Sequence, residues 1–413
     1  MPFLGTLRRE FSFIRGNYAV LVASWIIVDF AMELPATYYG LYVLGLGATE
    51  TILGVIGLSQ FLALASLQFP GGYLADKYGR KWLISTMTFG VALSFILYAI
   101  APSWPFILVG AIIMSICNST YQPALNAMVS DSLPPERRGM GFSIVMLIAS
   151  ASTTPSPAIA SLLRAYFGLI DGMRIAYGIV VALFLIAAFF RLFFLKETVV
   201  STSKPHLNEI IHSYPTALKE SVSVWRKVPK SMVYLFLSFS IVIFGFSSMN
   251  LFTVIYATRV LHIDEIMWGL IAATVPITTI ILAIPVGKLV DKFKRKIPIL
   301  TSLLIFGLAM WIFVNGDLAK VVVSLILLGA GQVMLNASFG ALQTDLTAKE
   351  QRGKVNGFIN FANYIIMAMG SLLGGYLYEH VSPQAPFMVA IATILPSFLL
   401  MLILVKEPEK REE

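Results

Sequence analysis

Two acidic residues, Asp29 and Glu33, lie within a long apolar segment near the start of the chain. Their spacing of four residues places them on one helix face together with Thr37. An ionised carboxylate inside hydrocarbon costs at least about 2.5–3.5 kcal/mol, so such residues face a watery cavity or a polar partner. Burial and mutual repulsion both favour protonation of the pair, which suits groups that gain and lose a proton. We therefore expect Asp29 and Glu33 to handle protons or to contact a substrate.

The segments that position this pair are expected to be transmembrane helices. Of the 413 residues 57% are hydrophobic and 13% are charged, and the mean hydropathy is +0.81, whereas soluble domains carry about a quarter charged residues. Apolar runs of about 20 residues, enough to cross roughly 30 Å of hydrocarbon, recur twelve times. The expected spans are 17–43, 51–74, 82–101, 105–129, 139–166, 173–195, 232–256, 267–290, 297–314, 318–342, 353–378 and 384–405. The sequence predicts an all-α, multi-pass membrane protein.

The positions of the basic residues orient these spans. With the N-terminus in the cytoplasm, all but four of the 30 Lys and Arg residues fall in cytoplasmic segments, as the positive-inside rule requires. The exceptions are Arg164, Arg174, Arg259 and Lys320. We expect a location in the cytoplasmic (inner) membrane with both termini in the cytoplasm, and the net charge of +8 reports this topology rather than nucleic-acid binding. The single cysteine, Cys117, excludes an intramolecular disulfide and a cysteine metal cluster.

The two halves of the chain resemble each other. FPGGYLADKYGRK at 69–81 returns as IPVGKLVDKFKRK at 284–296, a shift of 215, and Asp131 returns as Asp345 at a shift of 214. Self-similarity of this kind indicates a structural repeat. The equivalents of Asp29 and Glu33 are uncharged, which assigns proton handling to the first half.

The repeat predicts two parallel six-helix bundles. They comprise residues 1–195 and 231–413 and are joined by a polar, cytoplasmic linker at 196–230. Within the linker, 207–228 is expected to form a helix, either solvated or lying on the membrane surface.

The segment GYLADKYGRK, from Gly72 to Lys81, resembles the GxxxD(R/K)xGR(R/K) loop of the major facilitator superfamily. It falls between the second and third expected helices, where that family has it, and its copy falls between the eighth and ninth. The copy has Lys294 where the motif has its glycine. The resemblance covers essentially the whole chain and implies two pseudo-symmetric bundles around a site near the membrane midplane.

This loop combines a carboxylate with cations in a tight turn that Gly79 permits. By resemblance, Asp76 faces the N-terminus of helix eleven and Arg80 reaches Asp131 on helix four, so the loop latches the cytoplasmic ends of the halves. Alternatively, these residues only cap the turn and fix the orientation of the neighbouring helices in the membrane, without latching the halves. The residues assigned to the latch are Gly72, Asp76, Lys77, Gly79, Arg80, Asp131 and Asp291.

Helix five carries a second resemblance. Residues 152–161, STTPSPAIAS, are similar to the GxxxGPxxGG pattern of exporters in this superfamily, with Ser or Ala in place of each Gly. The corresponding part of helix eleven keeps glycines at Gly370, Gly374 and Gly375. Close helix packing explains such small residues equally well.

Uncharged polar residues recur at helical spacing in the helices that line the cavity of this superfamily. Amides can select a ligand without adding charge. Interhelical hydrogen bonding is the other explanation, because such bonds are common and average about 0.6 kcal/mol. The residues assigned to a substrate cavity are Thr37, Asn118, Gln122, Asn250, Gln332, Asn336, Asn360, Asn363 and Tyr364, with Asn126 on the same face as Gln122.

The combined expectation is a secondary transporter that works by alternating access, with the loop latch stabilising the outward-facing state. Two carboxylates and no cation at the same depth favour cationic or neutral lipophilic substrates, exported in exchange for protons. Proton-coupled uptake of a neutral nutrient such as a sugar is the alternative, and a non-transporting membrane receptor or scaffold is a rival from another class.

An enzyme is not expected, because the sequence has no HExxH, no Ser-His-Asp grouping and no GxxxxGK(S/T) phosphate loop. We expect no cofactor and no metal, with the proton gradient as the energy source. The expected partners are a small-molecule substrate and the lipid bilayer, with no nucleic acid, and the chain is expected to work as a monomer.

Overall fold

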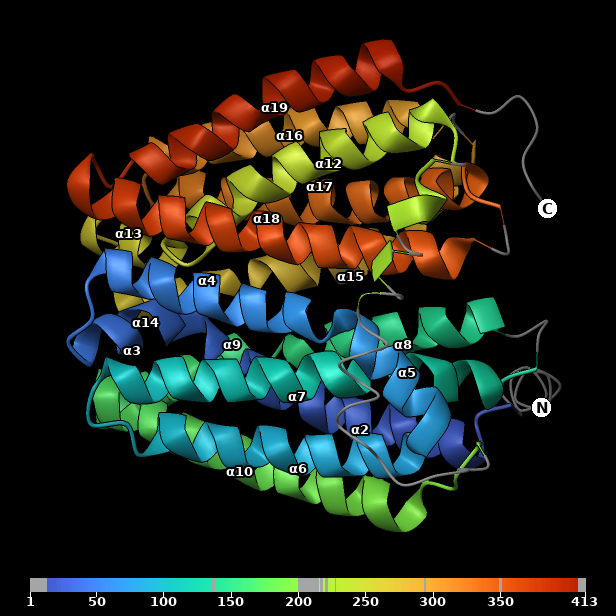
Figure 1. Ribbon diagram of the computed structural model, residues 1–413. Helices are drawn as coiled ribbons and strands as arrows, with labels where there is room; N and C mark the ends of the chain where they lie inside the picture. The colour runs from blue at the N-terminus through green and yellow to red at the C-terminus, as the bar shows by residue number, and fades with distance from the viewer. Residues whose placement is uncertain are drawn as a thin grey trace, which may run out of the picture.

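The computed structural model describes residues 13–134, 138–199, 228–292, 295–348 and 351–407, together with positions 215, 218, 219 and 222–226. In this part of the chain the regular secondary structure is helical. The long helices run roughly along one direction, and those of the first and second halves form two neighbouring groups (Figure 1). We call the end where α2 begins and α19 ends the terminal end, and the opposite end the far end.

The first half crosses the molecule six times. Three of its crossings are single helices and three are divided by short interruptions. In chain order the helices are α2 (Gly16–Glu33), η1 (Ala36–Tyr38), α3 (Tyr39–Gly45), α4 (Glu50–Ser66), α5 (Gln68–Tyr78), α6 (Arg80–Ala99), α7 (Trp104–Asp131), α8 (Arg138–Thr153), α9 (Ser156–Phe167) and α10 (Leu169–Phe194).

The second half repeats this order. Its first two crossings are divided and its last four are single helices. The helices are α12 (Lys230–Asn250), α13 (Thr253–Arg259), α14 (Glu265–Ala272), α15 (Thr274–Lys292), α16 (Lys296–Val314), α17 (Leu318–Asp345), α18 (Arg352–His380) and α19 (Ala385–Leu404). Most of the helix expected within the linker, at 207–228, lies outside the described residues.

Ten helical segments of the described chain are long and apolar enough to cross a membrane. The other two of the twelve predicted crossings are the divided pairs α4–α5 and α8–α9. Proline explains one of these interruptions, because it has no N–H to donate and disfavours helix at the preceding residue. Pro155 follows the end of α8 and caps α9. The predicted all-α fold of two six-helix bundles is confirmed.

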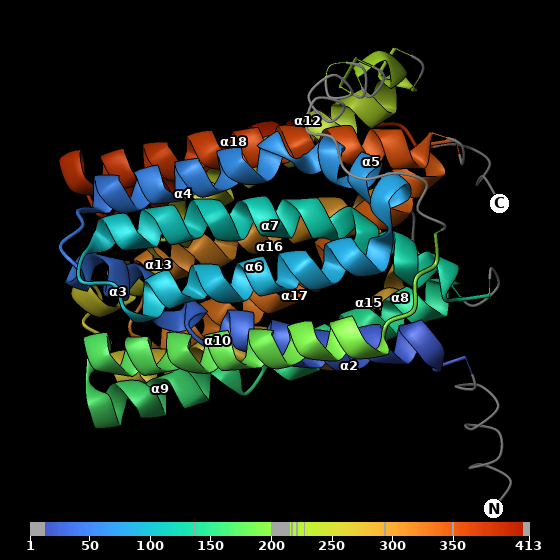
Figure 2. The same cartoon turned by 60° about the horizontal axis from the view of Figure 1, so that its bottom comes forward.

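Small residues let the two halves approach closely. Helices α4 and α18 lie side by side in both views (Figures 1 and 2). A Cβ atom on Gly54 of α4 would lie 2.7 Å from the carbonyl oxygen of Ser371, and one on Gly375 of α18 would lie 2.5 Å from that of Glu50. Near contact of this kind needs glycine at the crossing. The glycines of helix eleven therefore pack helices, as the packing explanation predicts.

The halves are also joined by polar contacts near the far end. Arg164 on α9 pairs with Glu265 on α14, and Arg259 on α13 pairs with Glu50 on α4, at N–O distances of 2.6 and 3.2 Å. The backbone N–H of Thr51 donates to Glu379 of α18 over 2.8 Å. These contacts close the far end of the molecule between the two bundles.

Candidate functional site

The acidic pair sits where the first crossing is interrupted. Helix α2 ends at Glu33, and its last turn is closed by the N–H of Leu34, which donates to the carbonyl of Phe30 over 3.1 Å. Pro35 then caps the short helix η1. Asp29 and Glu33 lie about 20 and 25 Å along the helix from Gly16, at 1.5 Å per residue. The proline thus places the Glu33 carboxylate at a break in the helix, deep between the two ends of the bundle.

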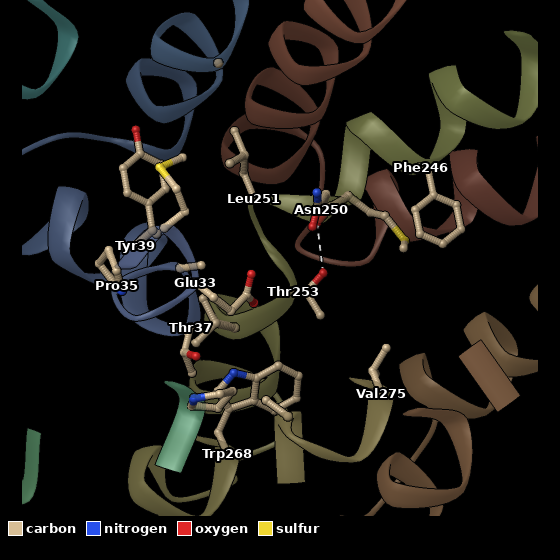
Figure 3. A pocket seen from close by; sticks show the side chains of 18 of the residues that line it. Glu33, Pro35, Thr37, Tyr39, Phe246, Asn250, Leu251, Thr253, Trp268 and Val275 are labelled. Carbon is tan, nitrogen blue, oxygen red and sulfur yellow. Dashed lines mark hydrogen bonds between the residues drawn. The ribbon is translucent and has the colours of Figure 1, made fainter. Parts of the chain in front are cut away.

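A cavity of about 590 Å³ opens beside Glu33. Both halves contribute to its wall: Figure 3 shows Glu33 and Thr37 near Trp268, while Phe246 and Asn250 project from the second half. Aromatic and apolar side chains make up most of the lining. The principal lining residues are Met32, Glu33, Thr37, Tyr39, Gln60, Phe61, Phe95, Tyr98, Met114, Tyr177, Phe246, Met249, Asn250, Thr253, Trp268 and Met310.

The chemistry of this wall is that of a site for an apolar or cationic ligand. Glu33 is the one acidic side chain among the described lining residues, and no Lys or Arg is among them. Aromatic faces attract cations as well as burying apolar surface. Gln60, Asn250 and Thr253 add hydrogen-bonding groups that carry no charge.

The predicted polar residues divide into two sets. Glu33, Thr37 and Asn250 line the cavity. The others are not among the residues that line it. Asn118 and Tyr364 are half-buried and Asn363 is buried, whereas five are exposed in the described structure: Gln122, Asn126, Gln332, Asn336 and Asn360. Their assignment to a substrate path stays a prediction, as does the role of Asp29, which is not among the lining residues.

Sequence reasoning missed part of the lining. Gln60 carries the same signal as the predicted amides, an amide within an apolar segment, and the same rule would have found it. The aromatic residues Phe95, Tyr98, Tyr177 and Trp268 carry no such signal, because aromatic side chains in apolar helices are equally expected in the core.

No cation was expected at the depth of the acidic pair, yet a buried one lies inside the same bundle. Arg191 of α10 is fully buried, and its charge acts on Asp29. By chain position Arg191 stands close to the terminal end of its helix and resembles a cation at the membrane edge. Its long side chain instead reaches the interior, where it contacts Ser24 of α2.

The loop motif between α5 and α6 is more helical than predicted. Asp76 and Lys77 belong to the last turns of α5, Arg80 begins α6, and Gly79 alone separates the two helices. Gly79 has φ +96, a conformation that side chains other than glycine's rarely adopt. The expected contact between Arg80 and Asp131 is present, and it joins α6 to α7 within the first half. The side chains of Asp76 and Asp291 and the surroundings of Gly72 lie outside the described part of the structure.

A carboxylate that the sequence did not point to completes this junction. Glu197 follows α10, and its two oxygens accept the backbone N–H groups of Arg80 and Lys81 over 2.9 and 3.0 Å. The second half has the same arrangement, because Glu407 accepts the N–H of Lys296 at the start of α16. An acceptor is favourable there, since the first N–H groups of a helix have no partner within it. A Lys-Glu pair after the last helix of each half was the available signal.

The chain matches the Major Facilitator Superfamily over residues 16–264 and 235–413. It is 24% identical to a protein of Lactococcus lactis described as a multi-drug resistance efflux pump PmrA homolog, covering 92% of this chain and 94% of that one. It is also 24% identical to the multidrug resistance protein MdtG of Escherichia coli, over 91% of each chain.

Solved structures share the fold. The nucleoside transporter NupG superposes with a TM-score of 0.74 at 15% identity, covering 94% of this chain and 99% of the other. A POT family transporter crystallised with 5-aminolevulinic acid gives a TM-score of 0.75 at 13% identity, over 94% and 95% of the two chains.

Two helical bundles around a central cavity define a multi-pass membrane transporter rather than an enzyme. More specifically, the chain belongs to the Major Facilitator Superfamily, with both halves of the sequence matching.

Proposed function

We propose that this protein exports cationic or neutral lipophilic small molecules in exchange for protons, by alternating access. The observation that carries the proposal is the position of Glu33, the one carboxylate in a mostly apolar and aromatic cavity lined by both halves and by no described Lys or Arg. A carboxylate in such a site attracts a cation and disfavours an anion. Relatives described as multidrug resistance proteins support export of varied compounds.

Proton coupling follows from the same carboxylate. A protonated Glu33 is neutral, whereas its ionised form binds a cationic substrate, so one site holds either a proton or a cation. Asp29, one helical turn away on α2, is the second group in this exchange. No cofactor is required, because the proton gradient supplies the energy.

The proposed orientation places the terminal end in the cytoplasm of the cell, with the chain in the cytoplasmic membrane. The distribution of Lys and Arg supports this assignment. The closed far end is then the external side, and the structure corresponds to a state closed to the outside by the ion pairs Arg164–Glu265 and Arg259–Glu50. Each chain supplies both walls of the cavity, which supports a functional monomer.

The test is transport by purified protein in liposomes under an imposed pH gradient. The solutes are a lipophilic cationic dye, a neutral sugar and an organic anion. We expect the dye to move against the proton flux, and Glu33→Gln and Asp29→Asn to abolish the coupling. Asp171→Asn is the matched control, because Asp171 is an exposed carboxylate paired with Arg174 on its own helix. If no solute moves with a proton gradient, proton-coupled export is wrong; if Asp29→Asn transports normally, the assignment of Asp29 is wrong.

A further inference from the structure

Arg191 is a charged side chain with no exposed surface, held inside the first bundle. Its Nε atom donates to the hydroxyl of Ser24 on α2 over 3.0 Å, and Nη1 donates to that of Thr88 on α6 over 2.8 Å. Both hydroxyls donate their own protons to carbonyls of their own helices, at Leu21 and Ile84. Their oxygens are therefore oriented to accept from the guanidinium, and three helices fix its position.

This environment leaves the guanidinium incompletely compensated. Two hydroxyls and Tyr121, whose ring centroid is 5.7 Å from the central guanidinium carbon and whose hydroxyl also interacts with Arg191, supply no formal negative charge. The Nη2 atom is buried without a hydrogen-bond acceptor in the described structure. An unpartnered buried donor on a charged group is strongly unfavourable, so this arrangement points to a further acceptor.

The acidic group whose charge interacts with that of Arg191 is Asp29, which follows Ser24 on α2. The other titratable groups around the pair are Glu33 on the same helix and Tyr121 and Cys117 on α7. Asp29 and Arg191 do not form an ion pair in this structure. Asp29 also lies outside the cavity lining, whereas Glu33 is part of it. The two carboxylates thus have different neighbours: a buried cation for one, and the substrate cavity for the other.

We propose that Arg191 is a positioning residue for proton coupling, whose free Nη2 group binds the Asp29 carboxylate when Asp29 releases its proton. Ser24 and Thr88 hold the guanidinium within reach, and the proton leaves Asp29 without creating an uncompensated charge in the membrane. The inference rests on the proposed function, and it makes Asp29 a second proton carrier beside Glu33, which is the carboxylate that contacts the substrate.

Protonation of Asp29 can be measured directly, without transport, by infrared titration of the carboxylic C=O band in purified protein. Asp29→Asn identifies the band. Arg191→Gln removes the cation, so Asp29 should hold its proton to a higher pH, with a midpoint raised by about one to three pH units. Arg191→Lys keeps the charge and should restore most of the wild-type midpoint. An Asp29 midpoint that is the same in wild type and Arg191→Gln overturns the inference.

A second variant keeps the test decisive if Arg191→Gln does not fold. Ser24→Ala combined with Thr88→Val removes both hydroxyls that hold the guanidinium within reach of Asp29, so the Asp29 midpoint should move to higher pH, towards that of Arg191→Gln. An unchanged or lowered midpoint overturns the inference. If the midpoint shifts as expected but the protein transports nothing, the role of Arg191 is supported and the proposed function is overturned. Failure of the inference and failure of the proposed function are therefore distinguishable.

Discussion

Arg164 of α9 and Glu265 of α14 form an ion pair across the two halves of the molecule, with Nε and Oε2 2.6 Å apart. The hydroxyl of Tyr38 donates to the backbone carbonyl of the same Glu265 over 2.6 Å. The first crossing, the fifth and the eighth therefore meet at one residue near the far end. Any conformation that opens this end must break these contacts.

Breaking the ion pair should shift the conformational equilibrium towards opening of the far end. Both side chains are partly exposed, and such pairs contribute about 0.2–1 kcal/mol, so Glu265→Gln should raise the far-open population by up to about fivefold. Spin-label distances between α9 and α14 in nanodiscs would measure it. The matched control is Arg174→Gln, which breaks a pair within α10. A distance distribution identical to that of wild type would show that the pair does not hold this end closed.

The close crossing of α4 and α18 gives a second prediction. Gly54→Ala places a Cβ atom 2.7 Å from the backbone oxygen of Ser371, which cannot move without its helix. Overpacking of this kind costs about 1–3 kcal/mol, so we expect a lower thermal midpoint in detergent. Gly178→Ala is the control, because a Cβ atom there meets nothing within 4 Å. Equal midpoints for the two variants would mean that the halves separate freely at this crossing.

Glu197 provides a third prediction. Glu197→Ala leaves the N–H groups of Arg80 and Lys81 without their acceptor, and loss of a helix cap costs about 0.5–2 kcal/mol. We expect a lower thermal midpoint and faster hydrogen exchange at the start of α6. Glu197→Gln keeps one side-chain acceptor and should be affected less. Unchanged exchange at Arg80 and Lys81 in Glu197→Ala would leave Glu197 without a capping role.

The sequence predicted those parts of the fold that depend on long apolar runs. Twelve crossings and two halves follow from hydrophobic length and from the repeat, and both require only that apolar residues avoid water. The interruptions were harder to predict. Pro35 indicates one break, but the residue between α4 and α5 is Leu67, in a conformation with φ −111 and ψ 10 that its type does not demand.

The candidate site was predicted less completely, because composition along one helix does not say which face meets which neighbour. Asp29 and Glu33 share a pattern, yet only Glu33 lines the cavity. Arg191 was counted with the cytoplasmic basic residues, because its position in the chain gives the place of its Cα atom and not the reach of its side chain. Seven of the nine residues assigned to a substrate cavity do not line the cavity beside Glu33, and their assignment stays a prediction, since helical spacing alone does not choose between lipid, packing and solvent.

The last prediction concerns the charge of the ligand. Glu33→Gln keeps the shape of the side chain and removes its charge. Binding of a lipophilic cation should therefore weaken by tenfold or more, while a neutral analogue of the same shape should bind as before. The wild-type protein should also lose affinity for the cation as the pH falls, because protonation neutralises Glu33, and the affinity of the variant should depend less on pH. Fluorescence titration in detergent with both ligands measures this. Trp268→Leu is the matched comparison: it removes an aromatic face of the same cavity and should weaken both ligands. If Glu33→Gln weakens the two ligands equally, Glu33 shapes the cavity and does not select by charge.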